Sequence, residues 1–231
     1  VLVLAVAAMV FAVVGPGDGA ASGQPVPDAD AAGARYRLDR PSAERDRAPL
    51  LDDAARNAGF RFRAGTTVVH RDAFVGAVAR ARPEARRLIA LVDGVTDVRL
   101  EPTDGDAVGL TVAGTKRYDV AIDIDRAGRT HGRRGVDRVV LHELGHVVDS
   151  ALVSDATMAP LQAAIPTPAE CGSACVSAPE RFAETFARWA TRHAATDLSA
   201  GYDVALPTPT LDAWGAQLAG VGAPGYSSPG L

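Results

Sequence analysis

The chain has 231 residues, with 24 basic and 28 acidic side chains and a formal net charge of −4. This length allows one domain of ordinary size with additional terminal segments. The near balance of charges, without a long basic run and interleaved aromatic residues, disfavours nucleic acid as a partner.

The N-terminal residues 1–14 are apolar and uncharged. This run is shorter than the roughly 20 residues that span a membrane, but it fits the apolar core of a secretory signal. We expect a signal peptide or an N-terminal membrane anchor, with a buried strand as the third alternative. An export signal would place the protein outside the cell or at its surface, and only an uncleaved segment would make the membrane a partner.

Residues 15–47, rich in Gly, Pro, Ala and charge, predict a flexible linker, so that the folded domain comprises residues 48–231. Helices are expected at 49–58 and 83–92, with a short strand at 68–69 and a helix capped by Asp72 after it. Strands are expected at 95–101, 107–112 and 118–125, and the last alternates apolar residues with aspartates. The turns between these strands favour an antiparallel meander.

The stretch 136–150 contains His142-Glu143-Leu144-Gly145-His146, the pattern H-E-x-x-H, inside an apolar run that predicts a buried helix. Positions four apart share one helix face, so His142 and His146 can point at one metal ion while Glu143 reaches a water molecule. This is the arrangement of zinc hydrolases. Two incidental histidines in a core helix are the alternative. The basic loop expected at 126–135 could meet an acidic substrate or be solvated.

A long loop is expected at 155–178, and it holds Cys171 and Cys175. In an exported protein this pair predicts a local disulfide, and a redox or metal-binding pair is the alternative. The next helix, at 179–189, offers Glu180 and Glu184 on one face. One carboxylate could bind metal while the other accepts a hydrogen bond from a ligand histidine. Alternatively, both glutamates are solvated and pair with arginines.

Asp149 also falls on the face of His142 and His146, where it could orient an imidazole or merely close the end of the helix. After residue 196 the chain predicts a tail with a short helix at 210–218 that packs over the C-terminal side of the domain.

The segments H-E-L-G-H-V-V-D and E-R-F-A-E-T-F resemble the zinc peptidases of the anthrax lethal factor and Pro-Pro endopeptidase group, whose pattern is H-E-x-G-H-x-x-D followed by E-x-F-A-E-x-F. The resemblance covers about residues 118–189. It implies that His142, His146 and Glu180 bind Zn²⁺, that Glu143 is the general base, and that Glu184 supports a ligand.

The resemblance also implies an α+β zincin fold, with a small, mostly antiparallel sheet packed on the H-E-x-x-H helix and the following ligand helix. An edge strand like 118–125 would bind extended peptide or protein substrate. The chain departs from the group because no tyrosine lies between His146 and Glu180, so Tyr202 or His193 would have to steady the oxyanion. The expected function is a secreted or surface-anchored zinc endopeptidase, and the alternative is a non-catalytic zinc-containing binding domain.

Overall fold

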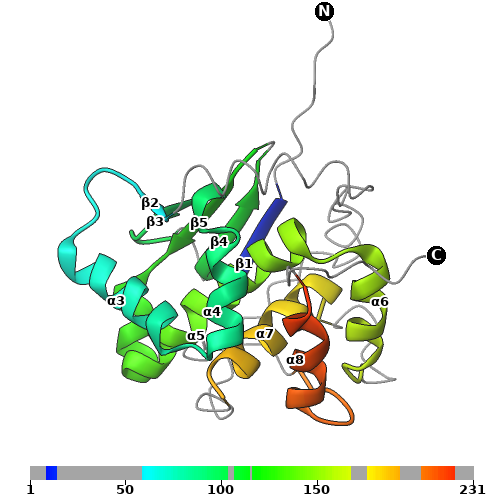
Figure 1. The fold of residues 1–231 in the computed structure, drawn as a ribbon. Coiled ribbons are helices and arrows are strands. Elements are labelled where there is room, and N and C mark those ends of the chain that lie inside the picture. Colours follow the sequence, from blue (N-terminus) through cyan, green and yellow to red (C-terminus); the bar gives the residue numbers. More distant parts are fainter. Residues whose placement is uncertain are drawn as a thin grey trace, which may run out of the picture.

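The computed structural model describes residues 59–103, 107–114, 116–167, 176–192 and 204–221, together with the backbone of residues 9–14. These residues form an α+β fold in which a mixed sheet packs on several helices (Figure 1). The predicted linker at 15–47, the helix at 49–58, the pair Cys171 and Cys175, and the oxyanion candidates Tyr202 and His193 lie outside the described residues.

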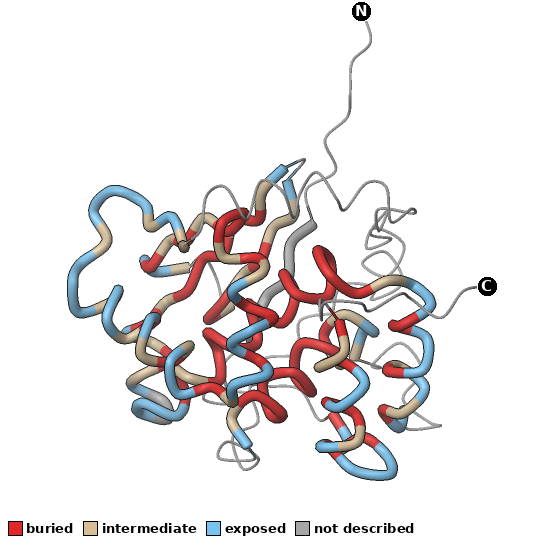
Figure 2. The backbone as a smooth tube through the Cα atoms, viewed as in Figure 1, coloured by how far each residue is buried: buried red, intermediate tan, exposed pale blue. Residues whose placement is uncertain are grey.

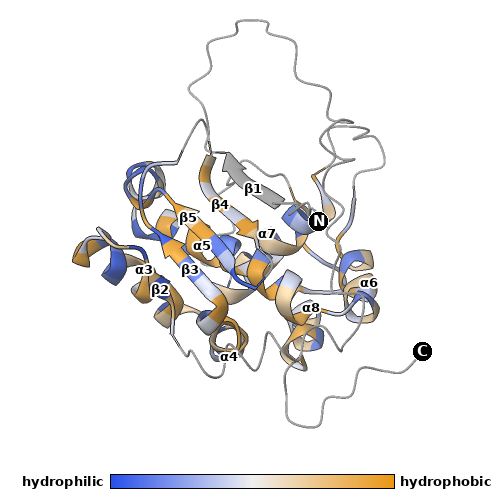
Figure 3. Cartoon of the chain, turned by 90° about the horizontal axis from the view of Figure 1, so that it is seen from above, coloured by the Kyte–Doolittle hydropathy of each residue, from blue (hydrophilic) through white to orange (hydrophobic). Residues whose placement is uncertain are grey.

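Five strands form one sheet in the order β1-β4-β5-β3-β2, which can be followed from above in Figure 3. They are β1 (Met9–Val14), β2 (Arg61–Phe62), β3 (Thr96–Arg99), β4 (Ala107–Ala113) and β5 (Tyr118–Ile122). The strand β3 pairs in parallel with both β2 and β5, whereas β4 is antiparallel to β5 and to β1.

The predicted meander and the predicted mostly antiparallel sheet are therefore wrong, although all three strands of the meander exist. A tight turn, in which the Gly114 N–H donates to the Arg117 carbonyl at 2.8 Å, joins β4 to β5 as a hairpin. The longer connection from β3 lets β4 pass to the outer side, so that β5 enters between β3 and β4. The predicted edge strand at 118–125 is consequently an inner strand, and β4 lies further out.

Beyond β4, the strand β1 covers the edge of the sheet. It runs antiparallel to β4, with Phe11 opposite Thr111 and Val13 opposite Gly109. A strand was one of the three alternatives for this apolar segment, and the export signal stays a prediction. Among the helices that the structure describes, none has the length and apolar character needed to cross a membrane.

Helix α5 (Ile124–Leu152) is the longest described element and replaces the predicted basic loop with helix. The Asp123 carboxylate begins it by accepting a hydrogen bond from the Arg126 N–H at 2.8 Å, which satisfies one of the free donors at a helix start. The loop prediction rested on glycines, and each costs only about 1 kcal/mol inside a helix. Of these, Gly132 alone adopts a positive φ, 59°, inside the helix.

Between β2 and β3 the chain forms α3 (Val68–Arg80) and α4 (Pro83–Ala90), followed by the short η1 (Asp93–Val95). The strand predicted at 68–69 is wrong, because the Thr67 hydroxyl accepts from the His70 N–H at 3.2 Å and starts α3 there. Thr67, rather than Asp72, is thus the capping residue.

The helices after α5 are α6 (Asp155–Ala163), α7 (Ala178–Ala190) and α8 (Leu211–Ala219). The loop predicted at 155–178 thus begins with a helix. Ser154 caps α6 by accepting from the Thr157 N–H at 3.1 Å, and burial of Met158 and Leu161 offsets the hydrogen bond lost at Pro160. The helices predicted at 83–92, 179–189 and 210–218 are confirmed as α4, α7 and α8.

The core lies where α5 packs against the inner strands on one side and against α7 on the other (Figure 2). Helix α8 packs against α7. The rings of Phe182 and Trp214 lie 5.4 Å apart, and those of Trp189 and Trp214 lie 6.3 Å apart. Buried aromatic side chains contribute on the order of 2–3 kcal/mol each. This packing fixes α7 against α5, and the two helices carry the polar residues described next.

Candidate metal centre

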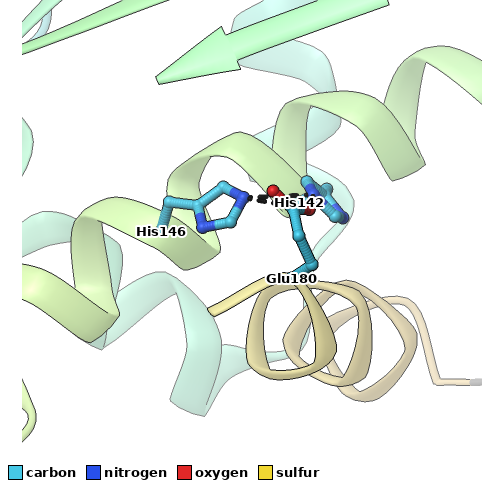
Figure 4. A group of neighbouring side chains, drawn as sticks. All are labelled: His142, His146 and Glu180. Carbon is cyan, nitrogen blue, oxygen red and sulfur yellow. Dashed lines mark hydrogen bonds and ion pairs between the residues drawn. The ribbon is translucent and has the colours of Figure 1, made fainter. Parts of the chain in front are cut away.

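Two histidines of α5 and one glutamate of α7 converge in the protein interior (Figure 4). His142 Nε2 lies 3.2 Å from His146 Nε2 and 3.0 Å from Glu180 Oε2, and His146 Nε2 lies 3.5 Å from the same oxygen. All three side chains are buried. One ligand atom from each residue lies within 4.8 Å of the others, so this group could hold a metal ion.

The close crossing of α5 and α7 brings the three side chains together. A Cβ at Gly145 would lie 3.1 Å from Ala183 Cα and 3.3 Å from the Ala183 carbonyl oxygen. Both distances are shorter than ordinary van der Waals contact, so the missing side chain lets the backbones approach. Gly145 precedes His146 directly, and Ala183 lies one turn after Glu180. The crossing point thus sits beside the ligand group.

Glu143 projects toward β4 rather than toward α7. The Thr111 hydroxyl of β4 donates to Glu143 Oε2 at 2.6 Å, and both residues are buried. Two residues earlier on the strand, a Cβ at Gly109 would lie 2.8 Å from the Glu143 carboxyl carbon. The Oε1 atom of Glu143 is buried and has no hydrogen-bond partner among the described residues. A carboxylate held through one oxygen therefore leaves the other to take a proton.

A third carboxylate, Glu184, lies on the Nδ1 side of His142. Its Oε2 lies 3.5 Å from His142 Nδ1, while its Oε1 forms ion pairs with Arg138 of α5 and with Arg188 of α7. Glu184 is fully buried, Arg138 is 1% exposed and Arg188 is 8% exposed. The centre thus includes two buried cations as well as its carboxylates.

The pKa shifts in the centre suit a set of metal ligands. Burial lowers the pKa of His142 to about 4, which keeps its imidazole neutral near pH 7. Burial alone would raise the pKa of Glu180, but His146 and His142 outweigh it and hold that pKa below its usual range. A neutral imidazole and an ionised carboxylate are the protonation states that bind metal.

The pKa of Glu143 shifts in the opposite direction. Burial raises it well above the usual value for a glutamate, and the hydrogen bond from Thr111 offsets only part of this increase. A carboxylate with a raised pKa has more affinity for a proton near neutral pH, which is the property of a general base.

The structure thus brings together five residues singled out from the sequence: His142, Glu143, His146, Glu180 and Glu184. A sixth, Asp149, is 1% exposed and lies one turn beyond His146 on α5.

Three neighbours of the centre were missed by the sequence analysis: Gly109, Thr111 and Arg138. The position of Arg138, four residues before His142 in an otherwise apolar run, was the one available signal. Gly109 and Thr111 meet Glu143 only through the packing of β4 on α5.

Two cavities in the described part of the protein have none of the residues of the centre in their lining. One of about 370 Å³ opens beside Asp97, Arg99 and Arg117, and one of about 270 Å³ lies beside Arg80 and Arg134. In comparisons with known proteins, no family model, no curated protein and no solved structure matches the chain.

Proposed function

We propose that this protein is a zinc-dependent endopeptidase of zincin fold that acts outside the cell or at its surface on peptide or protein substrates. The observation that carries this proposal is the convergence of His142, His146 and Glu180 on one point beside the buried Glu143. The resemblance of H-E-L-G-H-V-V-D and E-R-F-A-E-T-F to the lethal factor group supports the same function.

The donor set fits zinc. Zinc bonds of about 2.0–2.2 Å in tetrahedral geometry separate neighbouring ligand atoms by roughly 3.3–3.5 Å. The three separations here are 3.0, 3.2 and 3.5 Å, so small side-chain adjustments suffice. Two imidazoles and one carboxylate are also the ligand set of catalytic zinc sites, which leave a fourth position open.

The residues then divide the work of hydrolysis. Bound zinc would supply Lewis-acid chemistry, activating water for attack and polarising the peptide carbonyl. Glu143 would take the proton of the attacking water on Oε1, the oxygen that Thr111 does not bind, and deliver it to the leaving amine. The hydrogen bond from Thr111 to Oε2 would hold the carboxylate in place during both transfers.

The second candidate function is a non-catalytic zinc domain that binds a partner. The lack of a tyrosine between His146 and Glu180 favours it, because the lethal factor group uses one there to steady the oxyanion. The burial of Glu143 also favours it, because an active base must meet its substrate.

Metal analysis and a peptide library separate these functions. After mild dialysis we expect about one zinc per chain. Zinc-loaded protein should then cleave a proteome-derived peptide library at a reproducible motif. Glu143→Gln should keep its zinc and lose at least 100-fold in turnover, within the range that general-base catalysis contributes.

Each negative result has a distinct meaning. Undiminished turnover by Glu143→Gln would refute the assigned base. Bound zinc without any cleavage would support the binding domain. A chain without zinc would remove both candidates.

A further inference from the structure

The polar residues of α5 and α7 form two facing rows, each with a spacing of four residues. On α5 the row is Arg138, His142 and His146, and on α7 it is Glu180, Glu184 and Arg188. Side chains four apart lie on one face of a helix, so each row forms a stripe along its helix. The two histidines and Glu180 in these stripes account for metal binding. Arg138 lies one helical turn from His142, the nearest ligand.

Contacts across the two helices join the rows step by step. Arg138 pairs with Glu184, His142 lies between Glu184 and Glu180, and His146 lies beside Glu180. Arg138 therefore reaches the ligand group through Glu184.

The two oxygens of Glu184 have different neighbours. Oε1 is shared by Arg138 and by Arg188, whose Nε lies 2.9 Å away, whereas Oε2 faces His142 Nδ1 at 3.5 Å. Arg188 also donates to the Val204 carbonyl, which anchors it from the far side. Because two guanidinium groups restrain Oε1, the carboxylate keeps Oε2 directed at the imidazole.

We infer that Arg138 is a positioning residue for the metal centre. It holds Glu184 so that Oε2 faces His142 Nδ1 at 3.5 Å, where it draws the imidazole proton to Nδ1 against the competing Glu180 Oε2, which lies 3.0 Å from Nε2. A hydrogen bond at one ring nitrogen fixes both the tautomer and the ring orientation of a ligand histidine. The inference rests on the metal-binding part of the proposed function and does not depend on catalysis.

A purely structural role for Arg138 predicts a different result for the tautomer of His142. Buried arginines often serve only to neutralise a buried carboxylate, and losing one weakens the fold. Such a role would lower the stability of the protein without changing which nitrogen of His142 carries the proton. The tautomer of His142 in the metal-free protein thus separates the two roles.

The test compares the whole chain with Arg138→Met, Arg138→Lys and the control Arg134→Met. Arg134 is exposed on α5, one turn before Arg138. The first measurement is the tautomer of His142 at neutral pH, from long-range proton–nitrogen NMR on metal-free protein. The second is zinc affinity, from competition with a chromophoric chelator.

We expect wild type and Arg134→Met to divide the His142 proton between Nδ1 and Nε2 in the same ratio and to bind zinc equally well. Arg138→Met should move the His142 proton from Nδ1 toward Nε2 and weaken zinc binding by about 10- to 100-fold, the usual effect of losing support behind a ligand. Arg138→Lys keeps the charge but loses the planar fork, so its loss should be smaller and in the same direction.

An unchanged tautomer together with unchanged zinc affinity in Arg138→Met would overturn the inference. If Arg138→Met does not fold, Arg138→Lys decides: a loss of about 3-fold or more supports the inference, and wild-type behaviour in both measurements overturns it. A wild-type protein that binds no zinc would refute the proposed function, while the tautomer would still decide the role of Arg138.

Discussion

Replacing Gly109 by alanine should displace the proposed base without disturbing the metal ligands. The added Cβ would lie 2.8 Å from the Glu143 carboxyl carbon and 2.9 Å from its Cγ. Carbon atoms pack at about 3.5–4.0 Å, so the carboxylate has to move by roughly 1 Å. A misplacement of about 1 Å in a catalytic group can lower the rate about 100-fold. We therefore expect Gly109→Ala to lower kcat by about that factor.

The assay is turnover of the peptide selected from the library, measured beside the zinc content of the same sample. Gly128→Ala is the matched control, because its Cβ would meet nothing closer than Val136 Cγ2 at 3.8 Å and it lies on α5 itself. This control should keep full activity and gain up to about 1 kcal/mol in stability. Wild-type kcat in Gly109→Ala, with zinc bound, would refute the role assigned to the contact between β4 and Glu143.

Three further outcomes follow from the same geometry. Thr111→Val removes the hydroxyl that binds Glu143. Because hydrogen bonds to charged groups contribute about 1.5–3 kcal/mol, kcat should fall roughly 10- to 100-fold at unchanged zinc content, and a kcat equal to that of wild type would contradict this. Gly145→Val should force α5 and α7 apart, since even a Cβ at this position would lie 3.1 Å from the backbone of Ala183. The free energy of unfolding should fall by about 1–3 kcal/mol and zinc binding should weaken, whereas an unchanged Tm would show that the crossing can relax. In metal-free Glu143→Gln, the His142 pKa of about 4 lies below its value of about 6.5 in the unfolded chain, so the unfolded chain binds more protons between these pH values. The free energy of unfolding should therefore fall by up to about 3 kcal/mol as the pH is lowered from 6.5 to 4. The Glu143→Gln background is needed because the raised pKa of Glu143 acts in the opposite sense, and urea unfolding of the same protein carrying His142→Gln should lack most of this slope.

Local spacing was sufficient to predict the helices that carry the metal centre. The interval of four between His142 and His146 predicts that they share a face, and Pro179 predicts where the next helix starts. The structure places Glu180 beside both histidines at the predicted point of convergence. Gly109 and Thr111 had no such signal, because strand residues meet a helix through tertiary packing rather than through a local period.

The strands were predicted more reliably than their arrangement. Alternation and turn residues locate β3, β4 and β5, but nothing local to a strand encodes its neighbour. Parallel pairing of β3 with β5 depends on where the chain between β3 and β4 leads. Glycines and Pro160 led to predicted loops at 126–135 and in the first part of 155–178. Capping by Asp123 and Ser154, together with burial, outweighs those residues in α5 and α6.

The pairing of β1 with β4 has a consequence for any ligand that approaches along the sheet. The N–H and C=O groups on the outer edge of β4 could pair with one further strand, and β1 (Met9–Val14) already pairs with them. A peptide that pairs with this edge of β4 must displace β1, which belongs to the same chain. The effective concentration of β1 at the edge does not change when the protein is diluted. Access to Glu143 from this side is therefore a question of exchange between two strands rather than of an open channel.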